Sequence, residues 1–201
     1  MQLALVGMVL VGLERQNLGV IVNAAVGLAV TCVPAILERD YGVPMDAGLT
    51  VWVTGAVFLH AFGVVGVPGL TGNLYRGLWW WDHLTHALSS SVVAAVGYTF
   101  VRGLDEHTDA VYLPPRFTLV FVLVFVAAFG VLWEVIEFTL GGLSATLGGG
   151  AVLTQYGLED TMLDMAFDLV GGLLAGLFGT AHLTDLTGYV AERLDRLRDR
   201  T

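Results

Sequence analysis

Nine ionisable side chains lie within apolar stretches long enough to cross a membrane, where charged groups are costly and tend to face a protein interior. Stretch by stretch, they are His60; Asp82, His83 and His86; Glu134 and Glu137; and Asp160, Asp164 and Asp168. Within the last three stretches, residues three or four positions apart share one helix face. Each of these helices is therefore expected to present a polar stripe.

So many carboxylates cannot all stay ionised in a dry site, because like charges and the loss of water both oppose ionisation. Protons could neutralise them, and so could Arg76, which lies in a neighbouring loop. A divalent cation would do so while also using histidine nitrogen, and Zn, Fe or Mn accepts this mixed set of donors. The pattern predicts a divalent-metal site and leaves the identity of the metal open.

Several of these residues also have a purely structural interpretation. His60 alone is typical of a histidine that is hydrogen-bonded to a neighbouring helix. Asp82 and Asp160 stand where helices are expected to begin, and aspartate is favourable there as a cap and beside the positive helix end. Capping does not account for the four carboxylates that lie inside their stretches, which are Glu134, Glu137, Asp164 and Asp168.

The composition indicates a protein that resides in lipid, since 56% of the 201 residues are hydrophobic and only 13% are charged. Apolar stretches of about 20 residues match a hydrocarbon core of about 30 Å at 1.5 Å per helical residue. Six stretches are present, at residues 1–13, 18–37, 49–67, 82–101, 117–140 and 160–181. The first is short for a span and is expected to form a short or tilted helix. Residues 1–182 are thus predicted to form an all-α, polytopic transmembrane helical bundle with five to six spans.

The placement of arginine predicts the orientation, because short cytoplasmic loops carry the positive excess. All nine basic residues are arginine. If the C-terminus is cytoplasmic, seven of them lie on the inner side, and only Arg15 and Arg76 lie on the outer side. We therefore expect a multi-pass protein of the cell membrane with a cytoplasmic C-terminus. This topology puts Asp82 and Asp160 at the outer ends of their helices, so the metal site is expected near the extracytoplasmic face.

Shorter segments carry further expectations. Residues 183–201 are predicted to form a cytoplasmic amphipathic tail along the inner surface, although a solvated helical extension fits the same spacing. The turn-rich residues 69–77 and 141–150 predict loops. Trp79, Trp80 and Trp81 are typical of an interfacial aromatic belt, and the spacing of Gly172 and Gly176 favours close helix packing.

The net charge of −9 bears on the partners. Nucleic acid is not expected to bind, because the sequence lacks the basic stripe that phosphate contacts require. Membrane lipid is the expected partner, and the sequence leaves the oligomeric state open.

The polar segments resemble those of the YjdF-like family of small inner-membrane proteins, a family of unknown function. A Tyr-Asp-Arg-x-x-His pattern is similar to residues 81–86, where His83 replaces the arginine, and a Glu-x-x-Glu-Trp pattern is similar to residues 134–138. A Thr-Gln-Gly-Asp-x-Trp-Asp-x-x-x-Asp-Met pattern is similar to residues 154–165 and adds Gln155. The resemblance covers about residues 60–176. It implies one site formed by Asp82, His86, Glu134, Glu137, Asp160 and Asp164, with His60 and Gln155 beside it.

Three functions follow from these observations. The first is a membrane-embedded, metal-dependent hydrolase acting on a lipid or other membrane-associated substrate, in which a spare carboxylate takes a proton from metal-bound water. The second is a transporter or proton-coupled permease, whose carboxylates titrate during the cycle. The third is a structural membrane protein in which the polar cluster only holds the helices together.

Overall fold

The fold was analysed in a computed structural model, which describes residues 1–66, 72–107, 112–147, 152–153, 155–178 and 180–198. Over these residues the chain forms helices, with one isolated bridge between Gly66 and Asn73 and no β-strand. The helices are α1 (Gln2–Glu14), α2 (Leu18–Val30), α3 (Val33–Tyr41), α4 (Ala47–Val64), α5 (Leu74–Gly77), α6 (Trp81–His107), α7 (Pro115–Leu147), α8 (Leu158–Phe178) and α9 (Thr180–Arg198). The predicted all-α helical bundle is confirmed.

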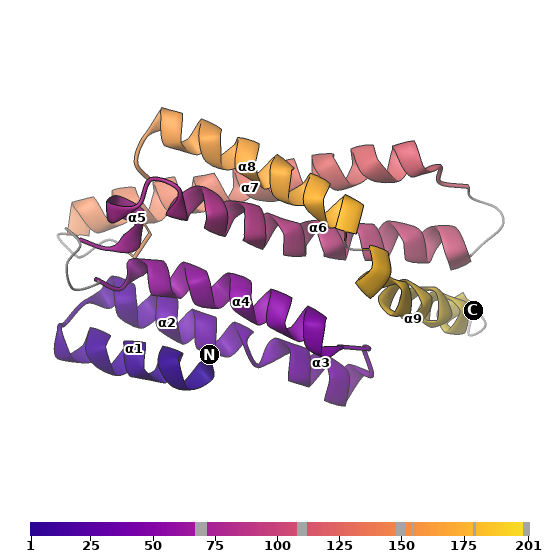
Figure 1. The fold of residues 1–201 in the computed structure, drawn as a ribbon, viewed down its shortest axis with the longest axis horizontal. Coiled ribbons are helices and arrows are strands. Elements are labelled where there is room, and N and C mark those ends of the chain that lie inside the picture. Colours follow the sequence, from indigo (N-terminus) through magenta and orange to yellow (C-terminus); the bar gives the residue numbers. More distant parts are fainter. Residues whose placement is uncertain (67–71, 108–111, 148–151, 154, 179, 199–201) are drawn as a thin grey trace.

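Two groups of helices lie side by side along the long axis of the molecule (Figure 1). One group contains α1, α2 and α4, and the other contains α6, α7 and α8; α4 packs against α6 and joins them. The short helix α5 and the start of α6 lie at one end of the bundle, whereas α9 and the C-terminus lie at the other. Because α6 contacts α4, α5, α7, α8 and α9, it is the central helix of the fold.

Four of the described helical segments are long and apolar enough to cross a membrane, at Leu18–Tyr41, Ala47–Val64, Trp81–His107 and Pro115–Thr146. The first of these combines α2 and α3. The predicted count of five to six spans also included two other segments. One is α1, which is apolar but has only 13 residues. The other is α8, which has 21 residues and packs along α6.

Local sequence explains where several helices begin. Asn17 accepts a hydrogen bond from the Val20 N–H at the start of α2, and Asp46 accepts one from the Leu49 N–H at the start of α4. These side chains satisfy backbone donors that the first helical turn leaves free. The loop prediction for residues 141–150 was wrong for its first part, because α7 continues to Leu147 through Gly141 and Gly142. Glycine weakens a helix by only about 1 kcal/mol per residue, so a long apolar helix can pass through it.

The closest packing in the second group occurs at Gly171, where α8 crosses α6. A Cβ atom at this position would overlap the backbone oxygen of Ala87 and the hydroxyl of Ser90. The predicted pair behaves differently: Gly172 lies against Val126 of α7, and no described atom lies within 4 Å of a Cβ built on Gly176. The closest approach of α8 to α6 therefore occurs one position before the predicted pair.

The three consecutive tryptophans do not share one environment. Trp79 is 80% exposed and Trp80 is 41% exposed, as the predicted aromatic belt requires. Trp81 is only 8% exposed and packs on Phe62, with ring centroids 6.2 Å apart. Its assignment to the belt was wrong, because it occupies the first turn of α6 and turns into the bundle.

The C-terminal segment forms helix α9, which packs against α6. Leu183, Thr187 and Ala191 are buried, and Gly103 of α6 leaves room for Val190. The segment is therefore amphipathic and directs its apolar face to the bundle. Its cytoplasmic location and the boundary at residue 183 stay predictions.

Candidate metal centre

Four helices bring the predicted polar residues together at the end of the bundle where α5 lies. The start of α6, the second half of α7 and the first half of α8 supply most of the side chains, and α4 contributes His60. Six of these residues are buried, namely His83, His86, Glu134, Glu137, Asp164 and Asp168. Asp164 is 1% exposed, so its charge is almost fully removed from water.

His86 lies at the centre of the cluster. Its Nε2 is 3.7 Å from Oδ1 of Asp82 and 3.9 Å from Oδ2 of Asp164. Both separations are too long for a hydrogen bond. They are close to the distance of about 3.4 Å that separates neighbouring ligands bound 2.0–2.2 Å from a tetrahedral metal ion. The three donor atoms are therefore arranged around a point rather than bonded to one another.

The structure contains two sets of three residues in which each residue offers one ligand atom, and the three atoms are close enough together to bind a metal ion. In the first, Asp82, His86 and Asp164, the ligand atoms lie within 4.8 Å of one another. In the second, His86, Glu134 and Glu137, the same limit holds. His86 belongs to both sets, so the other four residues surround a single histidine.

The remaining nitrogen of His86 is held by a carboxylate. Its Nδ1 lies 3.2 Å from Oδ1 of Asp168. Since a carboxylate accepts, Nδ1–H donates, and the lone pair of Nε2 then faces Asp82 and Asp164. A carboxylate behind the histidine is the usual arrangement for a metal ligand, because it fixes the ring and makes the nitrogen a better donor.

Asp164 is oriented in a similar way from its other side. The Nδ1 of His83 lies 3.0 Å from Oδ1 of Asp164, which leaves Oδ2 facing His86. The ring of His83 stacks on Phe167, with centroids 4.7 Å apart and planes inclined by 5°. In this arrangement His83 positions a ligand and is not one of the grouped donors, although the sequence had placed it among them.

Glu134 is fixed by only one of its two oxygens. Its Oε2 accepts hydrogen bonds from the Thr161 hydroxyl at 2.7 Å and from the Gln155 amide at 3.3 Å. Its Oε1 is buried and has no hydrogen-bond partner in the described part of the chain. A buried carboxylate oxygen without a partner is energetically costly, and a cation would relieve that cost.

Besides His83 and Asp168, two further predicted site residues lie outside these sets. Both ring nitrogens of His60 are hydrogen-bonded, Nδ1 with the Tyr75 hydroxyl at 2.9 Å and Nε2 with the Asn23 amide oxygen at 3.1 Å. Asp160 accepts a hydrogen bond from the Tyr156 N–H at 3.1 Å, which caps the start of α8. These contacts agree with the structural interpretation of the sequence, in which His60 is hydrogen-bonded to a neighbouring helix and Asp160 is a helix cap.

Arg76 of α5 brings positive charge near the cluster. The guanidinium of Arg76 lies over the ring of Tyr156, 5.9 Å from its centroid, and no ion pair between Arg76 and a carboxylate is found among the described residues. Burial raises the pKa of the Tyr75 phenol, so this residue keeps its proton beside His60. Within the described part of the chain, no arginine forms an ion pair with a buried carboxylate of the cluster.

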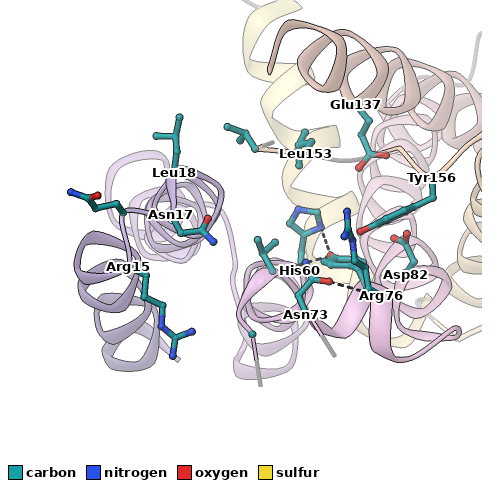
Figure 2. Close-up of a pocket in the computed structure, with 16 residues that line it drawn as sticks. Arg15, Asn17, Leu18, His60, Asn73, Arg76, Asp82, Glu137, Leu153 and Tyr156 are labelled. Carbon is teal, nitrogen blue, oxygen red and sulfur yellow. Dashed lines mark hydrogen bonds between the residues drawn. The ribbon is translucent and has the colours of Figure 1, made fainter. Parts of the chain in front are cut away.

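A cavity of about 600 Å³ leads to the cluster (Figure 2). Asp82 and Glu137 line it together with His60, Arg76 and Tyr156, and Arg15 stands on the far side in the view of Figure 2. Its size is within the range of about 300–1,000 Å³ that small-molecule sites occupy. A ligand in this cavity would meet two carboxylates of the candidate centre.

Some contributors were not singled out from the sequence. Thr161 fixes Glu134, and Asn23 of α2 bonds both His60 and the backbone oxygen of Val152. Asn23 carried a usable signal, since it is a polar residue inside an apolar stretch, but only ionisable residues were considered there. Thr161 carried no such signal, because threonine is ordinary at the start of a helix.

Asp168 provides a test of the arrangement around His86. Replacing it by asparagine keeps the shape of the side chain but removes the negative charge behind the imidazole. We expect metal affinity to fall about 10- to 100-fold, the usual effect of losing such a partner. Competition with a chromophoric chelator measures it. The matched control is Asp160→Asn, which alters a helix cap; equal losses in both variants would contradict the special role of Asp168.

Comparison with known proteins agrees with a membrane location. Residues 1–185 match the family described as "Predicted membrane protein (DUF2238)". An uncharacterised protein of Thermotoga maritima is 34% identical over 138 residues, which make up 69% of this chain and 65% of that relative's own length. No solved structure matches the chain. The YjdF-like name, which rested on residues 60–176, stays a resemblance. The chain belongs to the DUF2238 family of predicted membrane proteins.

Proposed function

We propose that the protein is a membrane-embedded, divalent-metal-dependent hydrolase that acts on a membrane-associated substrate near the extracytoplasmic face. One observation carries the proposal: Asp168 holds Nδ1 of His86, and Nε2 then faces the carboxylates of Asp82 and Asp164 at 3.7 and 3.9 Å. A packing cluster would be expected to close these gaps with hydrogen bonds. The open, convergent geometry supports a metal site.

The two sets around His86 favour one ion over two. A neutral imidazole whose Nδ1–H donates to Asp168 has a single free lone pair, so His86 can bind only one metal through Nε2. The ion would take Asp82 and Asp164 as further ligands, and Glu134 or Glu137 would complete the set. One nitrogen and several carboxylate oxygens suit Zn, Fe or Mn.

The residues lining the cavity suggest how hydrolysis would proceed. A divalent ion at this position would make a bound water acidic enough to lose a proton near neutral pH. Glu137 faces the cavity and would accept that proton. The water oxygen would bond to the central atom of a substrate ester, and the ester bond would break with its electron pair on the leaving oxygen. Glu137 would return the proton to that oxygen.

The proposed extracytoplasmic position of the centre rests on the distribution of arginine between the two ends of the bundle. The centre lies at the end of the bundle opposite α9 (Figure 1), and α9 carries Arg193 and Arg196. Arg39 belongs to α3, Arg102 to the C-terminal part of α6 and Arg116 to the first turn of α7. In Figure 1, α3, the end of α6 and the start of α7 lie at the same end of the bundle as α9. By the positive-inside rule that end is cytoplasmic and the centre is extracytoplasmic.

Elemental analysis of the detergent-purified, dialysed protein tests the proposal. We expect about one Zn, Fe or Mn per chain, because the set can hold one ion through His86. Metal-dependent release of a product from a lipid ester would support the hydrolase. Protein without stoichiometric metal would contradict the metal centre, and proton or ion flux into sealed vesicles would favour the permease instead.

A further inference from the structure

A second cavity meets the candidate centre from within the bundle. It has a volume of about 480 Å³, and its walls come mainly from α2, α4, α6 and α7. Most of its lining is apolar and includes Val26, Val57, Val93, Phe129 and Trp133. His86 and Asp168 also line it, so this apolar space ends at the centre of the cluster.

The two cavities adjoin. His60, Val152 and Leu153 line both of them. The cluster contributes Asp82 and Glu137 to the polar cavity and His86 and Asp168 to the apolar one, so it lies at the junction. A ligand that filled both spaces would be polar at one end and apolar at the other, with the centre between the two parts.

The polar cavity also carries positive charge, which would suit an anion. Arg15 and Arg76 both line it, and neither forms an ion pair with a carboxylate among the described residues. Asn17, Asn73 and Tyr156 add further polar side chains. Arginine matches the geometry of phosphate oxygens, and its cost of desolvation is low for a cation.

We infer that the substrate is a lipid with a phosphate-bearing headgroup, whose head contacts Arg15 and Arg76 and whose acyl chain occupies the apolar cavity beside Trp133. The identification as substrate rests on the proposed hydrolase; the binding of such a lipid does not. An acyl chain suits the second cavity because its valine and phenylalanine walls offer dispersion contacts and few hydrogen-bonding groups.

Fluorescence quenching tests the inference, because Trp133 lines the apolar cavity. Full-length protein in detergent would be titrated with a phosphatidic acid carrying brominated acyl chains, and with a diacylglycerol carrying the same chains. We expect saturable quenching by the phosphatidic acid and at least tenfold weaker binding of the diacylglycerol. The quenching that is lost in the Trp133→Phe variant is the quenching that reports on the apolar cavity.

Variants distinguish the contribution of the lipid headgroup to binding from that of the acyl chain. The double variant Arg15→Gln/Arg76→Gln should weaken phosphatidic acid binding at least tenfold, whereas Arg39→Gln/Arg116→Gln, at the other end of the bundle, should not change it. Val57→Phe should narrow the apolar cavity and weaken both lipids. Equal binding of the two lipids, an unchanged double variant, or complete displacement of the phosphatidic acid by equimolar inorganic phosphate would overturn the inference.

The same preparations distinguish this inference from the proposed function. Metal content is measured on each of them before the titration. Stoichiometric metal without selective phosphatidic acid binding removes the lipid inference and leaves the metal centre. Selective binding that persists in protein without metal upholds the lipid site and contradicts the hydrolase.

Discussion

Replacement of His86 by alanine is expected to abolish metal binding. His86 belongs to both sets of converging ligand atoms and provides their one nitrogen donor. Losing a partner behind a ligand already costs about 10- to 100-fold in affinity, so loss of the ligand itself should exceed the upper end of that range. Elemental analysis of the dialysed variant should find less than a tenth of the wild-type metal.

His107→Ala is the matched control for this variant. The Nδ1 of His107 lies 2.7 Å from Oδ1 of Asp195, so it too is a histidine paired with a carboxylate, but at the other end of the bundle. It should keep the full metal content. If His86→Ala elutes as a folded protein and still carries stoichiometric metal, the proposed centre is wrong.

Substitution of Gly171 by alanine is expected to produce the largest loss of stability among single methyl additions in α8. The new Cβ would overlap the backbone oxygen of Ala87 and the hydroxyl of Ser90, and backbone cannot move aside as a flexible side chain can. Overpacking of this kind costs about 1 to 3 kcal/mol. Thermal unfolding in detergent should show a lower Tm.

Metal content should fall in the same variant, for a geometric reason. The contact at Gly171 holds α8 against α6, and that contact sets the 3.0 Å and 3.2 Å pairs of His83 with Asp164 and of His86 with Asp168. Gly176→Ala is the control, because no atom of the described residues lies within 4 Å of its new Cβ. Equal behaviour of the two variants would show that close approach at Gly171 does not position the centre.

The membership of the cluster could largely be predicted from sequence because helical periodicity is a local property. Spacings of three and four residues put Asp82 with His86 and Glu134 with Glu137 on shared faces. The structure places these four and Asp164 in two sets that share His86. The cost of burying charge in lipid supplied the rest of the argument, since it requires such faces to meet one another.

The role of each member could not be predicted in the same way. Whether an aspartate caps a helix, as Asp160 does, or faces a histidine, as Asp164 does, depends on side-chain directions that two helices fix together. Which nitrogen of His86 is free depends on Asp168, 82 positions further along the chain. The two cavities likewise depend on how whole helices pack, and no short spacing encodes them.

The length of α7 gives the centre a dependence on its surroundings. Its 33 residues rise about 50 Å, well beyond a hydrocarbon core of about 30 Å, so this helix must tilt or project into the headgroup layer. Thinner and thicker bilayers demand different tilts. Glu134 and Glu137 belong to α7. His86 belongs to α6, and Asp164 and Asp168 belong to α8, which packs closely on α6 at Gly171. We therefore expect the thickness of the host membrane to change the separation between Glu137 and His86, whereas the hydrogen bond from Thr161 holds Glu134 to α8.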